Sequence, residues 1–260
     1  MSYETIRTER DGAAFVITFN RPARRNAVST KAMDEIMAAC REAEADEAIR
    51  AVILTGGIEY FSAGADLTEA RAISGAAAGI AYFNRWHELN NTLETLRKPV
   101  IAAIEGFCMT GGCELALACD LRVAAKGSSF AITSSKIGTV AGAGGTQRLP
   151  RIVGPANALD IMFSAEPISA EEAYRIGLIN RLTDKGGALS EAKAMVKIYE
   201  QRAPLSLAFV KRTVHRGMQM DLASAIEFET FLVTAIYGTE DRLEGIGAFL
   251  EKRQAQFKGR

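Results

Sequence analysis

The chain has 260 residues, of which 48% are hydrophobic and 24% charged, a composition typical of a soluble globular protein with a substantial core. Its 31 Lys and Arg residues balance its 31 Asp and Glu residues, so the charge gives no reason to expect nucleic acid or a membrane surface as a partner. The N-terminal segment has no apolar run of signal-peptide type, and no stretch approaches the roughly 18 uncharged apolar residues of a membrane span.

The cysteines and histidines indicate a cytoplasmic protein without a metal site. The four cysteines form no C-x-x-C pair, so we expect reduced, buried thiols. Only two histidines occur, His87 and His215, and they lack paired ligand spacing. His87 lies in a helical pattern, where a surface or half-buried position is expected.

The first half of the chain alternates between predicted strands and helices. The predicted elements are, in chain order, a strand at 13–20, a helix from Ser29 or Thr30 to about Arg41, a strand at 51–55, a helix that begins at Asp66, a helix at 80–97, a strand at 100–104, a helix that begins at Gly111 and a strand at 121–125. The Asp66-x-x-Glu69 spacing fits a capping box. This alternation predicts an α/β fold whose parallel strands are covered on both faces.

The second half of the chain changes character near residue 188. A glycine-rich loop at 142–145 leads into a helix, Ser169 opens another helix that ends at Gly177, and a short strand follows at 178–182. Beyond residue 188 only helical patterns occur. We therefore expect a core domain at 1–190 and a helical region at 191–260.

The glycine-rich loop is not a dinucleotide site. Its sequence, Gly142-Ala143-Gly144-Gly145-Thr146-Gln147, puts Gln147 where the G-x-G-x-x-G pattern needs its third glycine. A glycine-rich turn before a helix explains it. No G-x-S-x-G elbow and no phosphate-binding loop of the Walker type occur elsewhere.

Two other segments combine small residues with a helix start, at 61–67 (Phe-Ser-Ala-Gly-Ala-Asp-Leu) and 110–115 (Thr-Gly-Gly-Cys-Glu-Leu). Small residues let a backbone N–H group approach a ligand, and a helix start leaves such groups unpaired. Two converging N–H groups form an oxyanion hole. Glu114 lies three residues after Gly111 and so shares a helix face with that donor.

Glu114 is the strongest candidate for proton transfer. Its neighbours are almost all apolar, and a bare buried carboxylate costs several kcal/mol, so Glu114 is either paired or faces a cavity. Burial would raise its pKa, as general acid–base chemistry requires. The competing interpretation, a carboxylate that caps its own helix start, is compatible with catalysis. Asp66 and Glu69 are explained as helix caps.

Several motifs in the same order resemble the enoyl-CoA hydratase/isomerase family, also called the crotonase family. The segments that carry the resemblance are Asn20-Arg21-Pro22 with Asn26-Ala27, residues 63–67, residues 98–103, residues 111–115, residues 142–149, Ala173 with Gly177-Leu178-Ile179, and the tail 249–253. The resemblance covers nearly the whole chain. It implies a crotonase-like spiral of ββα units followed by a C-terminal helical trimerisation region, and hence a homotrimer or a dimer of trimers.

The resemblance also implies the substrate, an acyl-CoA thioester, with no cofactor because coenzyme A is part of the substrate. The N–H groups of Ala65 and Gly111 match the oxyanion hole, and Glu114 matches the glutamate that activates water. The expected substrate-binding positions are Arg24, Ala27, Ala63, Gly64, Asp66, Leu67, Gly112 and Gly142. Arg24 and Arg25 are the expected partners of the CoA phosphates in the core, with Lys252 and Arg253 serving a neighbouring subunit.

One position departs from the family's hydratases, which use a second glutamate. That glutamate corresponds to Ser134, and residues 127–145 contain no carboxylate at all. A serine hydroxyl can hold a water molecule but is too weak an acid or base to replace a carboxylate near neutral pH. A nucleophilic aspartate of dehalogenase type would match Gly142, which argues against that reaction.

Three explanations of Ser134 are open, and the preferred one is an acyl-CoA-processing lyase that hydrates its substrate. Glu114 could hydrate a 2-enoyl-CoA to a 3-hydroxyacyl-CoA with a water held by Ser134. It could instead move a proton between carbons in double-bond isomerisation. A specialised acyl-CoA could also bring its own ionisable group for decarboxylation or C–C cleavage, aided by Tyr82 or His87. The non-enzymatic alternative is an acyl-CoA-binding relative, against which the retained Glu114 argues.

Overall fold

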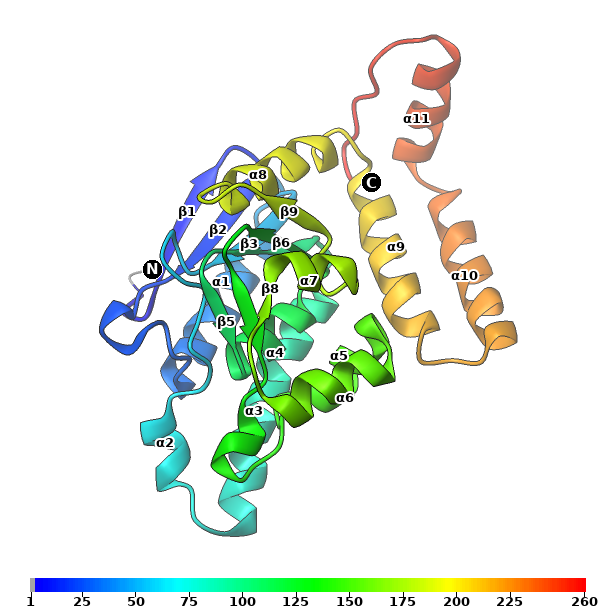
Figure 1. The fold of residues 1–260 in the computed structure, drawn as a ribbon. Helices are drawn as coiled ribbons and strands as arrows, with labels where there is room; N and C mark the ends of the chain where they lie inside the picture. Colours follow the sequence, from blue (N-terminus) through cyan, green and yellow to red (C-terminus); the bar gives the residue numbers. More distant parts are fainter. Residues whose placement is uncertain (1–2) are drawn as a thin grey trace.

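A computed structural model describes residues 3–260 and shows a twisted sheet surrounded by helices (Figure 1). The main sheet has six strands in the order β1-β2-β3-β4-β6-β9, namely β1 (Ile6–Asp11), β2 (Ala14–Phe19), β3 (Ala51–Thr55), β4 (Val100–Ile104), β6 (Leu121–Ala125) and β9 (Arg181–Thr183). Strands β2, β3, β4, β6 and β9 pair in parallel, as predicted. Strand β1 was not predicted and pairs antiparallel with β2.

The central parallel strands β3 and β4 are apolar except for Thr55, because both faces of the sheet are covered there. Every residue of β3 and β4 is buried. Alternate residues such as Val52 and Leu54 face the larger core, which includes residues of α1 (Thr30–Ala45), α3 (Gly75–Thr95) and α4 (Gly111–Ala118). The intervening Ala51 and Ile53 face α8 (Ala188–Tyr199) on the other side.

A second, smaller sheet lies beside the first and brings distant segments together. Its strands are β5 (Phe107–Met109), β7 (Ser129–Ala131) and β8 (Ile168–Ser169), with β5 parallel to β7 and β7 antiparallel to β8. These strands were not predicted, because two or three residues carry too little periodicity to distinguish a strand from a loop. Isolated bridges join Ser62 to Cys108 and Val28 to Ala65, so the segment after β3 is fixed against this layer.

The helix starts agree with the predicted caps, with one correction. The side chains of Ser29, Asp66 and Ser169 cap α1, α2 (Leu67–Ala72) and α7 (Ala170–Arg175), as predicted. Glu69, however, does not close a capping box on its own helix. Its Oε2 accepts 2.8 Å hydrogen bonds from the backbone N–H and the hydroxyl of Thr30, at the start of α1.

The predicted strand at 178–182 begins three residues later than expected, at Arg181. Leu178 and Ile179 are apolar because they pack in the core as the chain leaves α7, and the N–H groups of both donate to Ala173 O. Helices α5 (Gly145–Val153) and α6 (Pro155–Ser164) follow β7 in the chain and precede β8. Within residues 3–260, no helix is both long and apolar enough to cross a membrane.

The last three helices lie to one side of the sheet (Figure 1). They are α9 (Pro204–Gly217), α10 (Leu222–Ile236) and α11 (Glu240–Leu250). Helix α9 is tied to the core by Asp120, which accepts 2.8 Å bonds from Lys211 Nζ and from His215 Nε2. The predicted division at residue 190 falls within α8, which packs on the sheet, and the division stays a prediction.

Candidate active site

The two predicted donor segments meet. A Cβ atom placed on Gly111 would lie 3.0 Å from the backbone nitrogen of Ala65, and one placed on Gly64 would lie 3.2 Å from the nitrogen of Gly111. Neither the Ala65 nor the Gly111 N–H group donates a hydrogen bond to any residue within 3–260. Two unpaired N–H groups at adjacent positions are the arrangement that stabilises an oxyanion.

The Ala65 side of this pair is held by an extended bridge. Val28 donates its N–H to Gly64 O at 2.7 Å, and Asp66 donates to Val28 O at 3.0 Å, so the intervening Ala65 N–H points the other way. Gly64 has φ +104°, a conformation that favours glycine, and a side chain there would lie 2.9 Å from Met109 O. The sequence therefore needs glycine before the donor residue.

The Gly111 side is positioned by a strained residue. Thr110 adopts φ 42° and ψ −112°, an unfavourable conformation for a β-branched residue. It is held there by its N–H, which donates to Ala131 O at 2.7 Å, and by its hydroxyl, which lies 2.8 Å from that of Thr133. The bend turns the start of α4 so that the Gly111 N–H is left without an internal partner.

Trp86 forms a wall beside the two donors. Its indole is 1% exposed, and its Cη2 atom would lie 2.9 Å from a Cβ on Gly111. One turn earlier in α3, the hydroxyl oxygen of Tyr82 is buried without a hydrogen-bond partner among residues 3–260. Burial raises the pKa of Tyr82.

Glu114 projects from the same short helix as Gly111. Every residue of α4 is buried, and Glu114 is 2% exposed. Its Oε1 accepts two 2.8 Å hydrogen bonds, from the backbone N–H groups of Ala143 and Gly145, whereas no residue within 3–260 donates to Oε2. The second oxygen is therefore available for a substrate or a water molecule.

The surroundings of Glu114 set its acidity. Burial raises the pKa of Glu114 above its ordinary value, and the N–H groups of Gly145 and Ala143, with the positive charge of Arg148, limit that rise. Arg148 is itself held by Glu94, with Nε–Oε1 2.6 Å and Nη2–Oε2 3.0 Å. A carboxyl group with a raised pKa is suited to both accepting and returning a proton near neutral pH.

Ser134 is buried at 4% exposure in the short 3₁₀ segment Ser134–Ile137. Its hydroxyl donates no hydrogen bond to Glu114 or to another residue within 3–260, while its carbonyl accepts the N–H of Thr139 at 3.1 Å. The structure thus gives Glu114 no second ionisable partner from this segment.

The expected substrate-binding residues lie in several surroundings. Ala63 and Leu67 are exposed on either side of the Ala65 donor, and Asp66 forms a 2.8 Å ion pair with Arg21. Burial alone would raise the pKa of Asp66, but the bonds from Arg21 and from the Thr68 N–H hold it below its ordinary value.

The expected CoA-binding loop adjoins the donor segment. Arg24 and Arg25 are exposed and form no ion pair within residues 3–260, and Arg25 O accepts the Ala63 N–H at 3.0 Å. Ala27 is half-buried in the same loop. In the tail, Arg253 is already paired twice with Glu244, at 2.6 and 2.8 Å, which leaves it less free for phosphate than expected.

At the two remaining glycines, Gly112 and Gly142, neighbouring side chains occupy the space that a Cβ atom would need. A Cβ on Gly112 would lie 2.7 Å from that of Ser62, so this glycine allows α4 to pack closely. A Cβ on Gly142 would lie 2.3 Å from the Phe83 ring. A nucleophilic aspartate at 142 would therefore require Phe83 to move, which agrees with the argument against dehalogenation.

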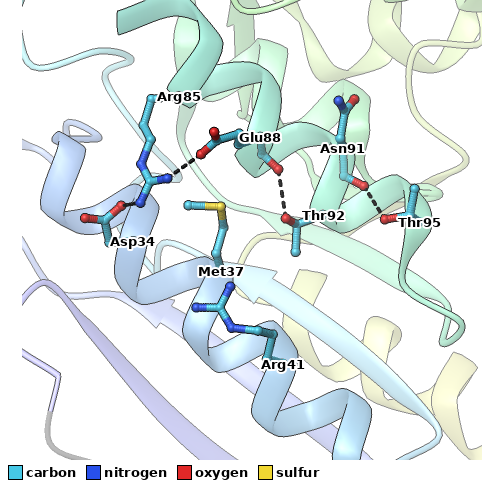
Figure 2. A pocket seen from close by; sticks show the side chains of 8 residues that line it. All are labelled: Asp34, Met37, Arg41, Arg85, Glu88, Asn91, Thr92 and Thr95. Atoms are coloured by element: carbon cyan, nitrogen blue, oxygen red, sulfur yellow. Dashed lines mark hydrogen bonds and ion pairs between the residues drawn. The ribbon is translucent and has the colours of Figure 1, made fainter. Parts of the chain in front are cut away.

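A surface cavity of about 590 Å³ lies between α1 and α3 (Figure 2). Arg85 pairs there with Asp34 and with Glu88. None of the candidate active-site residues lines this cavity. It is therefore separate from the site around Glu114.

Sequence reasoning missed the supports of the site more than the site itself. Three supports of the site depend on contacts between distant segments. They are the strained backbone of Thr110, the packing of Trp86 beside Gly111, and the two backbone N–H groups that donate to Glu114. The two donors to Glu114 could have been anticipated, since the glycine-rich loop at 142–145 leads into a helix, and a helix start presents free backbone N–H groups to a carboxylate.

Comparisons with known proteins agree over the whole chain. A sequence model of the family described as enoyl-CoA hydratase/isomerase matches residues 9–260. A short-chain-enoyl-CoA hydratase of Clostridium acetobutylicum is 37% identical over 265 residues, with 100% of each chain covered. A crotonyl-CoA hydratase of Syntrophomonas wolfei is 37% identical over 258 residues, with 99% of each covered. The crystal structure of an enoyl-CoA hydratase from Bacillus anthracis matches with a TM-score of 0.94 at 32% identity, covering 99% of this chain and 100% of that one.

Proposed function

The chain belongs to the enoyl-CoA hydratase/isomerase family of enzymes and has the crotonase fold, and we propose that it hydrates a 2-enoyl-CoA thioester to a 3-hydroxyacyl-CoA. The observation that carries the proposal is the meeting of the unpaired Ala65 and Gly111 N–H groups beside the buried Glu114. The two relatives at 37% identity are named for short-chain-enoyl-CoA and crotonyl-CoA hydration, which favours a short acyl chain.

In the proposed first step, the thioester oxygen accepts hydrogen bonds from the Ala65 and Gly111 N–H groups. A water molecule bound at Glu114 Oε2 forms a bond to C3 of the enoyl group and gives its proton to the carboxylate. The electron pair of the C2–C3 double bond moves toward the thioester, so negative charge collects on the oxygen that the two donors hold. Each such donor contributes roughly 3–4 kcal/mol in a well-studied hydrolase.

In the second step, the enolate accepts a proton at C2. We assign this proton to Glu114, which received it from water, since Ser134 offers no carboxylate as a second acid. The net result is the addition of one water molecule, and the carboxylate of Glu114 is restored. The hydroxyl of Ser134 is assigned only a share in holding water.

The same lone base supports a second candidate, double-bond isomerisation. That reaction removes a proton from one carbon of the acyl chain and returns it to another, so it needs one carboxylate and the same enolate stabilisation. The specific observation in its favour is that Ser134 makes no hydrogen bond to Glu114 and supplies no acid.

An acyl-CoA turnover panel in heavy water distinguishes these reactions. Hydration would add the mass of one water to a short 2-enoyl-CoA, with deuterium at C2 of the product. Isomerisation would leave the substrate's formula unchanged apart from exchanged deuterium. Absence of turnover across short, long, branched and carboxylated acyl-CoAs would contradict both and favour a binding protein.

The substrate's CoA part and the subunit assembly belong to the same proposal. We propose that Arg24 and Arg25 bind the CoA phosphates, a role supported by their exposure and by the lack of an ion pair to either among the described residues. Helices α9, α10 and α11 expose large apolar side chains, among them Met218 (69%), Leu222 (76%) and Phe249 (83%). An apolar surface of this kind favours burial between copies of the chain, in a homotrimer or a dimer of trimers.

A further inference from the structure

Asn90 is a buried polar residue that the proposed chemistry does not use. It lies in α3, one turn after Trp86, and is 0% exposed. Its Nδ2 donates a 2.6 Å hydrogen bond to the carbonyl oxygen of Ala143. The bond joins two segments that are 53 residues apart in the sequence, the last part of α3 and the glycine-rich loop before α5.

That loop presents three consecutive peptide units to two different partners. The first, between Gly142 and Ala143, and the third, between Gly144 and Gly145, each direct an N–H group at Glu114 Oε1 at 2.8 Å. The middle unit, between Ala143 and Gly144, directs its carbonyl at Asn90. Fixing the middle unit therefore fixes the orientation of the peptides on both sides.

The loop needs such a contact because its own backbone is permissive. Three of its four residues are glycines, and Gly144 adopts φ +97°. Glycine loses more conformational freedom on folding than any other residue, so this segment has many alternative conformations. The other side-chain donor to Ala143 O, Arg148 Nη1, is longer at 3.4 Å.

The oxygen of the Asn90 amide argues that Asn90 contributes little to the stability of the native protein. Its Oδ1 is buried and has no hydrogen-bond partner among residues 3–260. The cost of leaving a buried acceptor unpaired is comparable to what one satisfied hydrogen bond contributes. Reversing the amide would place Oδ1 against the Ala143 carbonyl, so the orientation with Nδ2 toward the loop is the one that the contacts allow.

We propose that Asn90 is a positioning residue, whose amide holds the middle peptide of the loop at 142–145 so that the N–H groups on either side stay directed at Glu114. The inference rests on the proposed role of Glu114 as acid and base. It predicts that loss of the amide releases the loop, weakens both donors and lets the carboxylate shift from its place beside the oxyanion hole.

The test replaces Asn90 by leucine, which has a similar shape and no polar atoms, with Asn91→Leu as the matched control. Asn91 is the next residue of α3, is exposed, and lines the surface cavity between α1 and α3 (Figure 2). We expect Asn90→Leu to lower kcat on the order of 10- to 100-fold with little change in KM, because misplacing a catalytic group mainly affects the reaction step. Asn91→Leu should leave both constants unchanged.

Two further readouts separate positioning from a structural role. The acid limb of the pH–kcat profile should move to higher pH in Asn90→Leu, since the N–H groups that stabilise the Glu114 carboxylate are no longer held. The midpoint of thermal unfolding should change little, because the substitution removes the unpaired Oδ1 together with the hydrogen bond to Ala143 O. An unchanged kcat and acid limb, or a loss of kcat that only follows loss of folded protein, would overturn the proposal.

Titration of Glu114 by carbon-13 NMR in the wild type and in Asn90→Leu, with Glu114→Gln to assign the signal, does not depend on turnover. A shift of the Glu114 titration in an inactive protein would overturn the proposed function and leave the positioning role standing. Turnover of an enoyl-CoA by the wild type, without any shift of the Glu114 titration in Asn90→Leu, would overturn the positioning role and leave the proposed function standing. If Asn90→Leu fails to fold, Asn90→Ala removes the same amide without added bulk, and failure of both to fold would make Asn90 a structural residue.

Discussion

The Gly145 N–H and the Glu114 carboxylate approach so closely that residue 145 has no room for a side chain. The N–H donates to Oε1 at 2.8 Å, and a Cβ at 145 would lie 2.9 Å from both the Oε1 and the Cγ of Glu114. The bond stabilises the ionised carboxylate, while burial opposes ionisation. The balance between the two gives Glu114 its capacity to exchange a proton.

Replacing Glu114 by glutamine should lower kcat by about two to four orders of magnitude with little change in KM, because the amide retains the shape but cannot take a proton. The measurement is steady-state hydration of a short 2-enoyl-CoA. Glu105→Gln is the matched control, since Glu105 is 4% exposed and also accepts two backbone N–H groups, those of Gly186 and Ala188. The Glu105→Gln control should be less stable but keep its kcat. Full activity in Glu114→Gln would contradict the assignment of Glu114 as the acid and base.

Replacing Gly111 by alanine should close the oxyanion hole. The added methyl group would lie 2.9 Å from Trp86 Cη2 and 3.0 Å from the Ala65 nitrogen, within the space that the thioester oxygen needs. We expect kcat to fall on the order of 10²- to 10³-fold, as for loss of one oxyanion donor. Gly217→Ala is the control, because its methyl group would meet only Ala225 Cβ at 3.6 Å. Equal kcat in both variants would mean that the thioester binds elsewhere.

Substitutions at Ser134 test the missing carboxylate. Ser134→Ala should cost much less than Glu114→Gln, because a hydroxyl that only holds water contributes no proton transfer. If the lack of a second acid limits hydration, Ser134→Glu should raise the rate with a short 2-enoyl-CoA. The neighbouring Ser135 is exposed, so Ser135→Glu controls for an added charge. No gain in folded Ser134→Glu would favour isomerisation over hydration.

Lys211 should contribute strongly to the stability of the native protein. Its side chain is 7% exposed, and Nζ donates to Asp120 Oδ2 and to Leu93 O, both at 2.8 Å. Lys211→Met would leave the largely buried Asp120 with fewer partners and should lower the free energy of unfolding by about 3 kcal/mol. Denaturant unfolding at one protein concentration measures the change. Lys126→Met, which breaks an exposed ion pair with Asp184, should change it far less, and equal effects would contradict this account.

The sequence was most informative where chemistry and backbone geometry coincide locally. Asp66 as the cap of α2 follows from a residue type at a helix start, and the structure confirms it. The family is recognisable from short motifs in a fixed order, which the comparisons confirm. The buried strands β3 and β4 follow from unbroken apolar runs between turn residues.

The sequence was least informative where a residue's role depends on a distant segment. In strand β1 only Ile6 is buried and the other five residues are polar, so the strand forms through its pairing with β2 despite a weak local preference for strand. Glu69 satisfies a local capping pattern but bonds Thr30 instead, 39 residues away. Asn90 gives no local signal at all, because its partner becomes apparent only once the loop at 142–145 is packed on α3.

The pH dependence of stability gives a further test of Glu114. Its ordinary pKa is 4.5, and the native pKa is higher. Between these two values the native protein binds more protons than the unfolded chain, so stability falls as pH rises through this window. The contribution is fully present below pH 4.5 and is lost once pH exceeds the native pKa.

Glu114→Gln removes this titration and isolates it from those of other carboxyl groups. The free energy of unfolding of the variant, relative to that of the wild type, should therefore increase as pH rises from about 4.5 and level off above the native pKa. Denaturant unfolding of both proteins across this range measures the difference. A difference that decreases with rising pH would mean that the donors from Ala143 and Gly145 outweigh burial and that Glu114 is an ordinary, strongly ionised carboxylate.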